Sequence, residues 1–114
     1  MDQTTTVSQL KALVEQFVRQ RHWEQFHTPK NLSMGLAVEA AELMDLFKWH
    51  AGPDSVQAIR QRAIRAAVRD ELADVVIYCL AFANRTGIDI AQAVKRKISK
   101  NRSKYPARKS RGRF

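Results

Sequence analysis

Residues 32–49, LSMGLAVEAAELMDLFKW, decide the fold of this chain. Their leucines recur three, four or seven residues apart, which is the spacing of one face of an amphipathic helix. These leucines are Leu32, Leu36, Leu43 and Leu46. Glu39 interrupts the apolar face, and Glu42 lies three residues further on, one turn along the same helix. The stretch therefore predicts a helix that carries two carboxylates at the edge of an apolar surface.

A second stretch, residues 71–77, repeats this arrangement. Glu71 and Asp74 are again three residues apart, and the residues around them are apolar. Two carboxylates about 5 Å apart, at an effective dielectric of about 20, repel each other by roughly 3 kcal/mol, so two facing pairs require a counter-charge. Oxygen ligands of this kind suit Mg²⁺, with Mn²⁺ as a substitute, and these ions also bind phosphates.

The four carboxylates allow other interpretations. They could be solvated helix faces or partners of the many Arg side chains, in which case no metal binds. A di-iron centre is a third interpretation, because Glu24 and His27 have the E-x-x-H spacing of di-iron bundles. Such bundles need two copies of that motif, and the single copy here disfavours them. No cluster of Cys and His indicates zinc.

The rest of the chain also has a helical pattern, with few strand signals. Ser8 or a preceding Thr can cap a first helix, and the Thr-Pro pair at 28–29 favours the start of a second, which the Gly-Pro pair at 52–53 stops. Gly87 and Asp89 separate the last two helices. The sequence therefore predicts an all-α fold. The expected helices cover residues 8–26, 29–49, 55–84 and 90–101, with residues 56–69 as a candidate separate helix.

The 114 residues, 45% of them hydrophobic, suit one domain with a packed core. The formal net charge of +9 is unevenly distributed. Residues 1–94 carry ten Lys or Arg against eleven Asp or Glu, whereas residues 95–114 carry ten Lys or Arg and no acidic residue. The near-neutral body disfavours a nucleic-acid partner. We expect a domain over residues 1–106 and a basic C-terminal tail over residues 107–114.

The single cysteine, Cys79, excludes an internal disulfide and fits a reducing cytoplasm. It lies in an apolar run, where a small core residue is expected rather than a nucleophile. The N-terminus, MDQTTTVSQ, lacks the basic start and apolar run of a signal peptide. The apolar stretches are too short or too interrupted by charge to span a bilayer. These features predict a cytoplasmic protein without a membrane partner.

An ordered set of motifs extends over about residues 10–106. They are Trp23-Glu24-Gln25-Phe26-His27 followed by Pro29, Asn31 and Leu32; Glu39-Ala-Ala-Glu42-Leu43 followed by Phe47 and Trp49; Glu71-Leu-Ala-Asp74-Val75 followed by Tyr78; Gly87-Ile88-Asp89; and Lys97, Asn101 and Lys104-Tyr105-Pro106. Single motifs of this set would be weak, but the ordered set is highly specific. On these residues the sequence resembles the MazG-like all-α NTP pyrophosphatases, and more narrowly their dCTP pyrophosphatase branch.

The resemblance implies a four-helix bundle that forms a homodimer, or a homotetramer built as a dimer of dimers. It also implies a Mg²⁺-dependent nucleotide diphosphatase, which cleaves a nucleoside triphosphate, here expected to be dCTP, to the monophosphate and pyrophosphate. Such an activity would serve nucleotide-pool house-cleaning. The residues that match the catalytic metal ligands of the family are Glu39, Glu42, Glu71 and Asp74.

The resemblance further implies which residues contact the nucleotide. Those that match the pocket are Trp23, Glu24, Gln25, Phe26, His27, Asn31, Trp49 and Tyr78. Lys97, Asn101 and Tyr105 match contacts on the phosphate side, and their i, i+4, i+8 spacing places them on one helical face. Residues 59–69 and 107–114 are not part of the recognised pattern.

Taken alone, several of these residues keep a second interpretation. Trp23 and Trp49 lie near helix ends, where they could stack on a base or fill the core, and stacking does not by itself discriminate between bases. His27 fits a base-reading role and a structural role equally well. The face that carries Lys97 could simply be solvated.

Three rival functions stay open at this point. The nearest is a broad-specificity NTP pyrophosphatase. The second is a non-catalytic, basic nucleic-acid-binding helical module, which the tail supports but the carboxylates oppose, because they would repel phosphate. The third is a non-catalytic helical oligomer, which is disfavoured because all four candidate metal ligands are intact.

Overall fold

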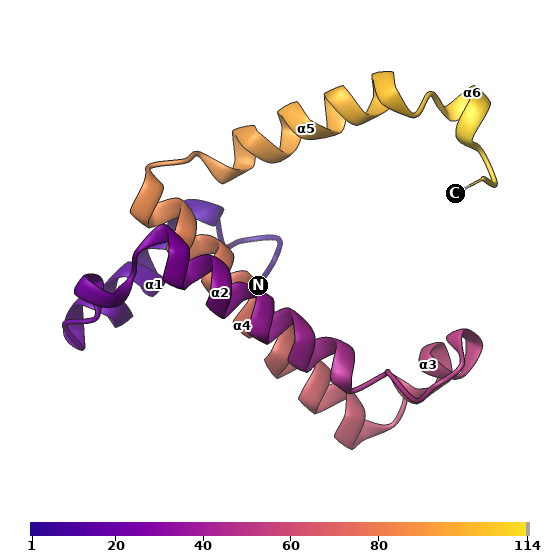
Figure 1. Ribbon diagram of the computed structural model, residues 1–114, viewed down its shortest axis with the longest axis horizontal. Helices are drawn as coiled ribbons and strands as arrows, with labels where there is room; N and C mark the ends of the chain where they lie inside the picture. The colour runs from indigo at the N-terminus through magenta and orange to yellow at the C-terminus, as the bar shows by residue number, and fades with distance from the viewer. Residues whose placement is uncertain (114) are drawn as a thin grey trace.

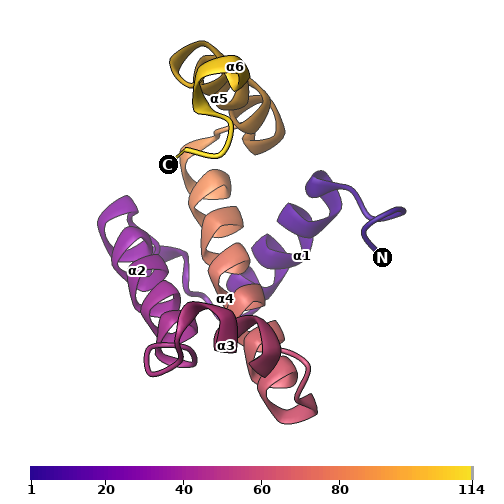
Figure 2. The ribbon, with the colours of Figure 1, turned by 90° about the vertical axis from the view of Figure 1, so that its right-hand side faces the viewer.

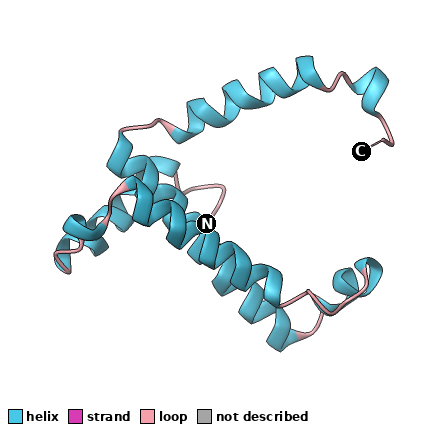
Figure 3. Cartoon of the chain, in the orientation of Figure 1, coloured by secondary structure: helices cyan, strands magenta, loops and turns pink. Residues whose placement is uncertain are grey.

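The computed structural model describes residues 1–113, and over that range the chain forms helices and turns without a strand (Figure 3). This confirms the predicted all-α class. The elements are α1 (Val7–Gln20), the 3-10 turn η1 (Glu24–Phe26), α2 (Pro29–Asp45), α3 (Gly52–Ala58), α4 (Arg62–Thr86), α5 (Ile90–Lys104) and α6 (Ala107–Ser110).

Side-chain caps set the starts of three helices, α1, α2 and α5. At the start of α1, the Thr6 hydroxyl accepts a hydrogen bond from the Gln9 N–H at 3.1 Å, and the Gln9 side chain accepts one from the Thr6 N–H at 2.7 Å. Thr28 caps α2 and Asp89 caps α5, each by accepting from the N–H three residues further on. After α4, Gly87 adopts the left-handed conformation (φ 70°) that ends the helix. All of these positions were predicted as helix boundaries.

Several predicted helix ends are wrong. The first helix stops at Gln20, short of residues 23–26, and His22 follows with a positive φ of 52° that a right-handed helix cannot contain. The second helix stops at Asp45, before the predicted end at Trp49. Pro53 lies in the first turn of α3, where its missing N–H needs no partner, so the Gly-Pro pair also begins a helix.

The predicted count of four helices corresponds to the four long ones, α1, α2, α4 and α5. Within residues 1–113 there are two further short helices, so the count is six. The predicted third helix is split, because α3 ends at Ala58 and α4 begins only at Arg62. The short α6 falls inside the predicted basic tail.

The central element is α4, on which α1 and α2 pack from different sides (Figure 2). α2 and α4 run antiparallel, since Gly35, in the first half of α2, meets Tyr78, in the second half of α4, while Glu42 lies further along α2 and meets the earlier Glu71 of α4. Leu32, only 1% exposed, is the most deeply buried core residue. The core cluster consists of Val14, Val18, Leu32, Leu80 and Ala81.

The fifth helix leaves this body (Figure 1). Ile90, at its start, packs against the core, and the Lys11 side chain donates a hydrogen bond to the Ile88 carbonyl at 3.2 Å. Beyond this anchor, α5 extends away from the other long helices, and its Val94 and Ile98 are 49% and 46% exposed. The single chain therefore leaves an apolar helix face uncovered. Within residues 1–113, no helix has both the length and the apolar character needed to cross a bilayer.

Candidate metal centre and adjoining groove

The antiparallel pair of α2 and α4 brings the predicted carboxylates together. Side chains three residues apart on a helix lie one turn apart on the same side, so each helix presents two carboxylates to the other. Glu39 and Glu42 from α2 meet Glu71 from α4, and one carboxylate oxygen from each lies within 4.8 Å of the other two. The centre is therefore built entirely by these two helices.

Two oxygens of this cluster are buried without a partner. Glu39 Oε2 and Glu71 Oε2 have no hydrogen-bond partner among residues 1–113. The two ion pairs in that part of the chain lie on α1 and at the end of α2, and neither involves the cluster. Leaving buried polar atoms unsatisfied is unfavourable, so these oxygens require a ligand. The interpretation that Arg side chains pair with these carboxylates is wrong for the described chain.

Burial and the neighbouring carboxylates raise pKa values within the cluster. Burial, followed by the charge and hydrogen bond of Glu42 and by the charges of Asp74 and Glu71, raises the pKa of Glu39 from 4.5 to about 7. Burial and the charge of Glu42 also raise the pKa of Glu71. Asp74 is not one of the three residues whose oxygens lie within 4.8 Å, but its charge acts on both glutamates. All four predicted carboxylates therefore share one electrostatic field.

This donor set fits a hard divalent cation. It supplies only carboxylate oxygens, the ligands that Mg²⁺ and Mn²⁺ prefer. The unpartnered oxygens of Glu39 and Glu71 are the atoms that such a cation would satisfy. A bound cation stabilises the ionised carboxylates and would return the pKa of Glu39 toward its ordinary value.

A groove of about 990 Å³ opens beside the carboxylates, between α1 and α4. Glu39 and Asp74 lie on its wall together with Trp23, His27 and Tyr78. The remaining wall is mostly apolar and comes from both helices. Aromatic side chains next to a candidate metal centre suit a ligand with a stacking base at one end and phosphates at the other.

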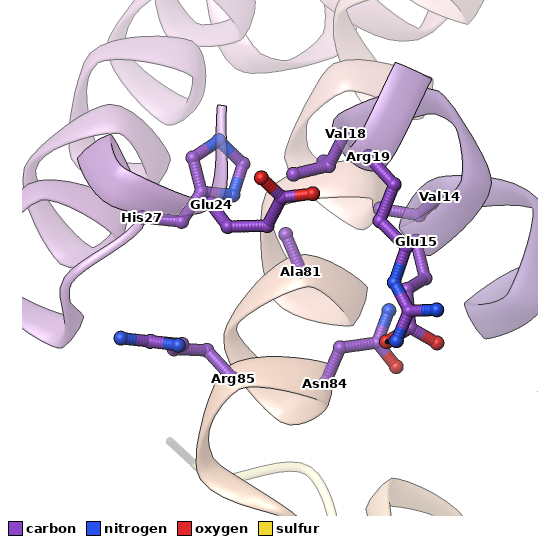
Figure 4. A pocket seen from close by; sticks show the side chains of 9 residues that line it. All are labelled: Val14, Glu15, Val18, Arg19, Glu24, His27, Ala81, Asn84 and Arg85. Carbon is purple, nitrogen blue, oxygen red and sulfur yellow. Dashed lines mark hydrogen bonds and ion pairs between the residues drawn. The ribbon is translucent and has the colours of Figure 1, made fainter. Parts of the chain in front are cut away.

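A smaller pocket of about 200 Å³ lies between α1, η1 and α4 (Figure 4). Glu24 and His27 lie close together at its wall, and Arg85 and Asn84 approach from α4. The Asn84 amide already donates a hydrogen bond to the Lys11 carbonyl at 2.9 Å. Because His27 lines both this pocket and the groove, the two hollows adjoin at this residue.

Other predicted pocket residues build the turn between α1 and α2. The Gln25 amide donates a hydrogen bond to the His22 carbonyl at 3.2 Å, and the Asn31 amide donates to the Phe26 carbonyl at 3.0 Å. The Phe26 side chain points outward and is 58% exposed. Within one chain, the hydrogen bonds fix the turn that presents Trp23 to the groove.

Trp49 lies outside the groove. It follows α2, it is 87% exposed, and Lys48 Nζ lies 5.5 Å from the centre of its ring. Trp23, by contrast, is 43% exposed and lines the groove. The structure therefore does not bring the two tryptophans to one place within a single chain.

The predicted phosphate-side residues lie on α5, away from the carboxylates. Lys97 lines a shallow hollow on that helix together with Arg96 and Lys100. Tyr105 follows the helix and is 57% exposed. Asn101 lies between them in sequence, in the last turn of the α5 arm that extends from the body (Figure 1).

Two residues near the centre were missed by sequence reasoning. Arg69 lines the groove with Glu39 and Asp74, although it belongs to the Arg-rich segment outside the recognised pattern. Gly35 leaves the space that the Tyr78 ring occupies. A signal for Gly35 was present, since a glycine inside a strongly helical pattern often has a packing reason.

Comparison with known proteins assigns the chain to a family. Residues 35–113 match the MazG-like family, and the chain belongs to it. It is 40% identical over 107 residues to dCTP pyrophosphatase 1 of Rattus norvegicus, which covers 94% of this chain and 63% of the relative. The human dCTP pyrophosphatase 1 is 42% identical over 103 residues, which covers 90% of this chain and 60% of that protein. The predicted resemblance is confirmed, and the chain spans a little less than two thirds of these relatives.

A solved structure agrees with this assignment. The crystal structure of a pyrophosphatase from Archaeoglobus fulgidus superposes with a TM-score of 0.81 at 36% sequence identity. The match covers 87% of this chain and 91% of the archaeal one. The helical arrangement thus has the fold of that pyrophosphatase.

Proposed function

We propose that this protein is a Mg²⁺-dependent nucleoside triphosphate pyrophosphohydrolase that converts a deoxynucleoside triphosphate, foremost dCTP, and water to the monophosphate and pyrophosphate. One observation carries the proposal: buried carboxylate oxygens without a partner lie beside a groove with aromatic walls. The relatives named dCTP pyrophosphatase 1 support dCTP as the substrate. The free thiol of Cys79 is compatible with a cytoplasmic role in nucleotide-pool house-cleaning.

The metal would be held by Glu39, Glu42, Glu71 and Asp74. When bound there, it supplies neutralisation of the phosphate charge and a lowered pKa of a coordinated water. A triphosphate carries several negative charges and would otherwise be repelled by these carboxylates.

The protein's own groups perform the remaining tasks. A carboxylate oxygen of the cluster that is free of metal can orient the attacking water and accept its proton. The water oxygen forms a bond to the α-phosphorus, the bond from that phosphorus to the bridging oxygen breaks, and pyrophosphate leaves with the electron pair.

The nucleoside end would lie among Trp23, His27 and Tyr78. Stacking on an aromatic ring contributes roughly 1–3 kcal/mol per base, and His27 can hydrogen-bond to the base edge. The Glu24 carboxylate, beside His27 in the adjoining pocket, is placed to orient its imidazole or to accept from the base (Figure 4).

We further propose that the active form is a homodimer or a dimer of dimers. In one chain, the α5 arm that carries Lys97, Asn101 and, directly after it, Tyr105 extends away from the body, and the exposed Trp49 does not line the groove. Association would cover the exposed apolar face of α5, with Val94 and Ile98, and complete a bundle. It would also allow the α5 arm of a partner to approach the phosphates. Small domains commonly gain buried surface in this way.

A broad-specificity NTP pyrophosphatase is the second candidate. It is favoured by the groove itself, whose base end offers aromatic rings and a single imidazole. Stacking tolerates every base, so few groups in the groove distinguish cytosine from the others.

The test is to incubate the protein with each dNTP and NTP in the presence of Mg²⁺ and to identify the products. dCMP and pyrophosphate are expected from dCTP. Release of dCDP and orthophosphate would contradict the proposed bond cleavage. Equal kcat/KM for all bases would favour the second candidate, and no turnover of any nucleotide would overturn both.

A further inference from the structure

The C-terminal arm, α5 with α6, carries a positive charge of which the proposed function uses only Lys97. Residues 95–114 hold ten Lys or Arg and no acidic residue. These basic residues are exposed throughout the described part of the arm, and the two ion pairs among residues 1–113 lie elsewhere, on α1 and at the end of α2. Unpaired like charges repel one another, so the arm favours a polyanionic partner that would neutralise them.

Three of these cations form a row on α5, here called the basic stripe, which consists of Arg96, Lys100 and Lys104. Their i, i+4, i+8 spacing places them on one side of the helix, over about 12 Å of its axis. Arg96 and Lys100 border the same shallow hollow on the helix surface, which confirms that they share a side. The stripe is therefore a surface and not only a run of charge in the sequence.

The basic stripe is separate from the other two faces of α5. The row proposed for the substrate phosphates, which begins at Lys97, starts one residue later and is turned by about 100° about the helix axis. Val94 and Ile98 each precede a stripe residue by two positions, which is about 200°, so the exposed apolar face lies on the opposite side of the helix. The stripe therefore stays accessible when association covers the apolar face.

The composition of the arm favours a nucleic acid over a lipid surface. A helix that binds a bilayer surface needs large apolar side chains, such as Trp, Phe or Leu, opposite its basic face. Residues 90–113 contain none of these three types. Duplex DNA carries one negative charge per about 1.7 Å of its axis, and Lys and Arg bind its phosphates without any apolar insertion. The charge of the stripe, without a large apolar face, fits this partner.

We propose that the basic stripe, together with the cations of the chain after it, binds the phosphate backbone of a nucleic acid without reading its sequence. The near-neutral body, residues 1–94, disfavours such a partner, and its carboxylates would repel it, so the contact is confined to the arm. The protein is then held on a nucleic acid while its carboxylate centre stays free for a nucleoside triphosphate. This binding goes beyond the proposed hydrolysis and does not depend on it.

The test compares the double variant Arg96→Gln/Lys100→Gln with the control Arg62→Gln/Arg65→Gln, both in the full chain. Arg62 and Arg65 are exposed at the start of α4, border none of the three hollows described above and remove the same net charge. Fluorescence anisotropy measures the binding of two labelled DNA duplexes of unrelated sequence between about 50 and 200 mM salt, a range over which phosphate contacts weaken strongly.

The unaltered protein should bind both duplexes equally, with an affinity that falls steeply as salt rises. The stripe variant should bind more weakly, and its slope of log K against log salt concentration should be smaller by about 2, which is one phosphate contact per lost cation. The control should keep the slope of the unaltered protein. Both double variants should keep its melting temperature, because exposed positions tolerate substitution.

The proposal would be overturned by the absence of duplex binding at about 50 mM salt, where phosphate contacts are strong. Binding only to vesicles of phosphatidylserine and phosphatidylcholine would assign the stripe to a lipid surface instead. An equal change of slope in both double variants would reduce the effect to net charge. Displacement of the duplex by dCTP with Mg²⁺ would place it in the nucleotide groove and contradict binding on the arm. Failure of the proposed hydrolysis is distinguishable, since it leaves duplex binding unchanged.

Discussion

The ring of Tyr78 on α4 occupies the space that a side chain on Gly35 of α2 would need. A Cβ atom on Gly35 would lie 2.6 Å from Tyr78 Cζ and closer still to Cε1, which real contacts do not allow. Gly35 is one turn before Glu39, and Tyr78 is one turn after Asp74. The glycine thus lets an aromatic residue of the groove settle between the helices that form the carboxylate centre.

Gly35→Ala should therefore displace the Tyr78 ring. Ala is favoured over Gly inside a helix by about 1 kcal/mol, whereas overpacking costs about 1–3 kcal/mol, so we expect no gain in stability and a raised KM for dCTP. Gly52→Ala is the matched control, because a Cβ there meets nothing within 4 Å. Thermal melts and steady-state kinetics of the two variants are the measurements. A stabilised Gly35→Ala protein with unchanged KM would show that the ring moves freely.

Glu39→Gln removes one charge from the cluster and keeps the side-chain shape. The metal-free variant should be as stable as the unaltered protein or more stable, because like-charge repulsion is relieved. Mg²⁺ should raise the melting temperature of the unaltered protein by binding its folded state, raise that of the variant much less, and support no turnover by the variant.

Asp45→Asn is the control for this experiment, since Asp45 is also on α2 but is exposed and paired with Lys48. It should change stability by no more than about 0.5 kcal/mol and leave the Mg²⁺ response intact. A metal-free Glu39→Gln protein that melts well below the unaltered one, with no Mg²⁺ response in either, would remove the metal assignment.

The raised pKa of Glu39 predicts how the stability of the metal-free protein depends on pH. Below its ordinary pKa of 4.5, the carboxyl is protonated in the folded and the unfolded chain, and its folded-state advantage is fully present. Between pH 4.5 and about 7, Glu39 ionises more readily in the unfolded chain than in the folded one, so the free energy of unfolding decreases. Above about 7 the carboxyl is ionised in both states, and the free energy of unfolding no longer changes with pH through this group. The melting temperature of the unaltered protein relative to Glu39→Gln, measured in EDTA, should fall across this window. A difference that rises with pH would have the wrong sign.

Trp23→Ala should weaken dCTP binding by roughly 1–3 kcal/mol, the magnitude of base stacking. Trp49→Ala tests the second predicted stacking residue, and its 87% exposure implies no loss of melting temperature. Any loss of affinity in the Trp49 variant would then report a contact with nucleotide in the assembled protein. If both variants keep the kcat/KM of the unaltered protein for all nucleotides, neither tryptophan lines the base site.

Light scattering at micromolar concentration should give the mass of a dimer or tetramer. Ile98→Glu on α5 should shift the mass toward the monomer, because it places a charge on an exposed apolar face that association would bury. Lys95→Glu on the same helix controls for the change of charge. A monomeric mass for the unaltered protein would exclude the proposed assembly.

The carboxylate centre was readable from the sequence because local spacing determines it. Glu39 with Glu42, and Glu71 with Asp74, each follow the helical repeat, and the apolar residues around them require the two helices to pack. Their convergence then follows from packing alone. The starts of α1, α2 and α5 were equally local, since each cap bonds to an N–H three residues away.

Features that depend on distant contacts or on an unusual backbone were not readable. The positive φ of His22 ends α1 early and turns Trp23 toward the groove, yet no residue type at that position demands it. The placement of Arg69 on the groove wall depends on how α1 lies against α4. The direction in which α5 leaves the body follows the turn at Gly87, whose angle the sequence does not determine.

The whole carboxylate centre rests on two helices whose mutual register is fixed by their own contact, and the segment 46–61 merely connects their ends. Its length and sequence can therefore change with little effect on the positions of the carboxylates. A single residue inserted within α2 between Gly35 and Glu42 would instead rotate Glu42 about the helix axis by about 100° relative to Gly35. We expect insertions and deletions to be tolerated in the connection and not within the helix pair, which makes the connection a suitable place to graft a reporter or a second domain.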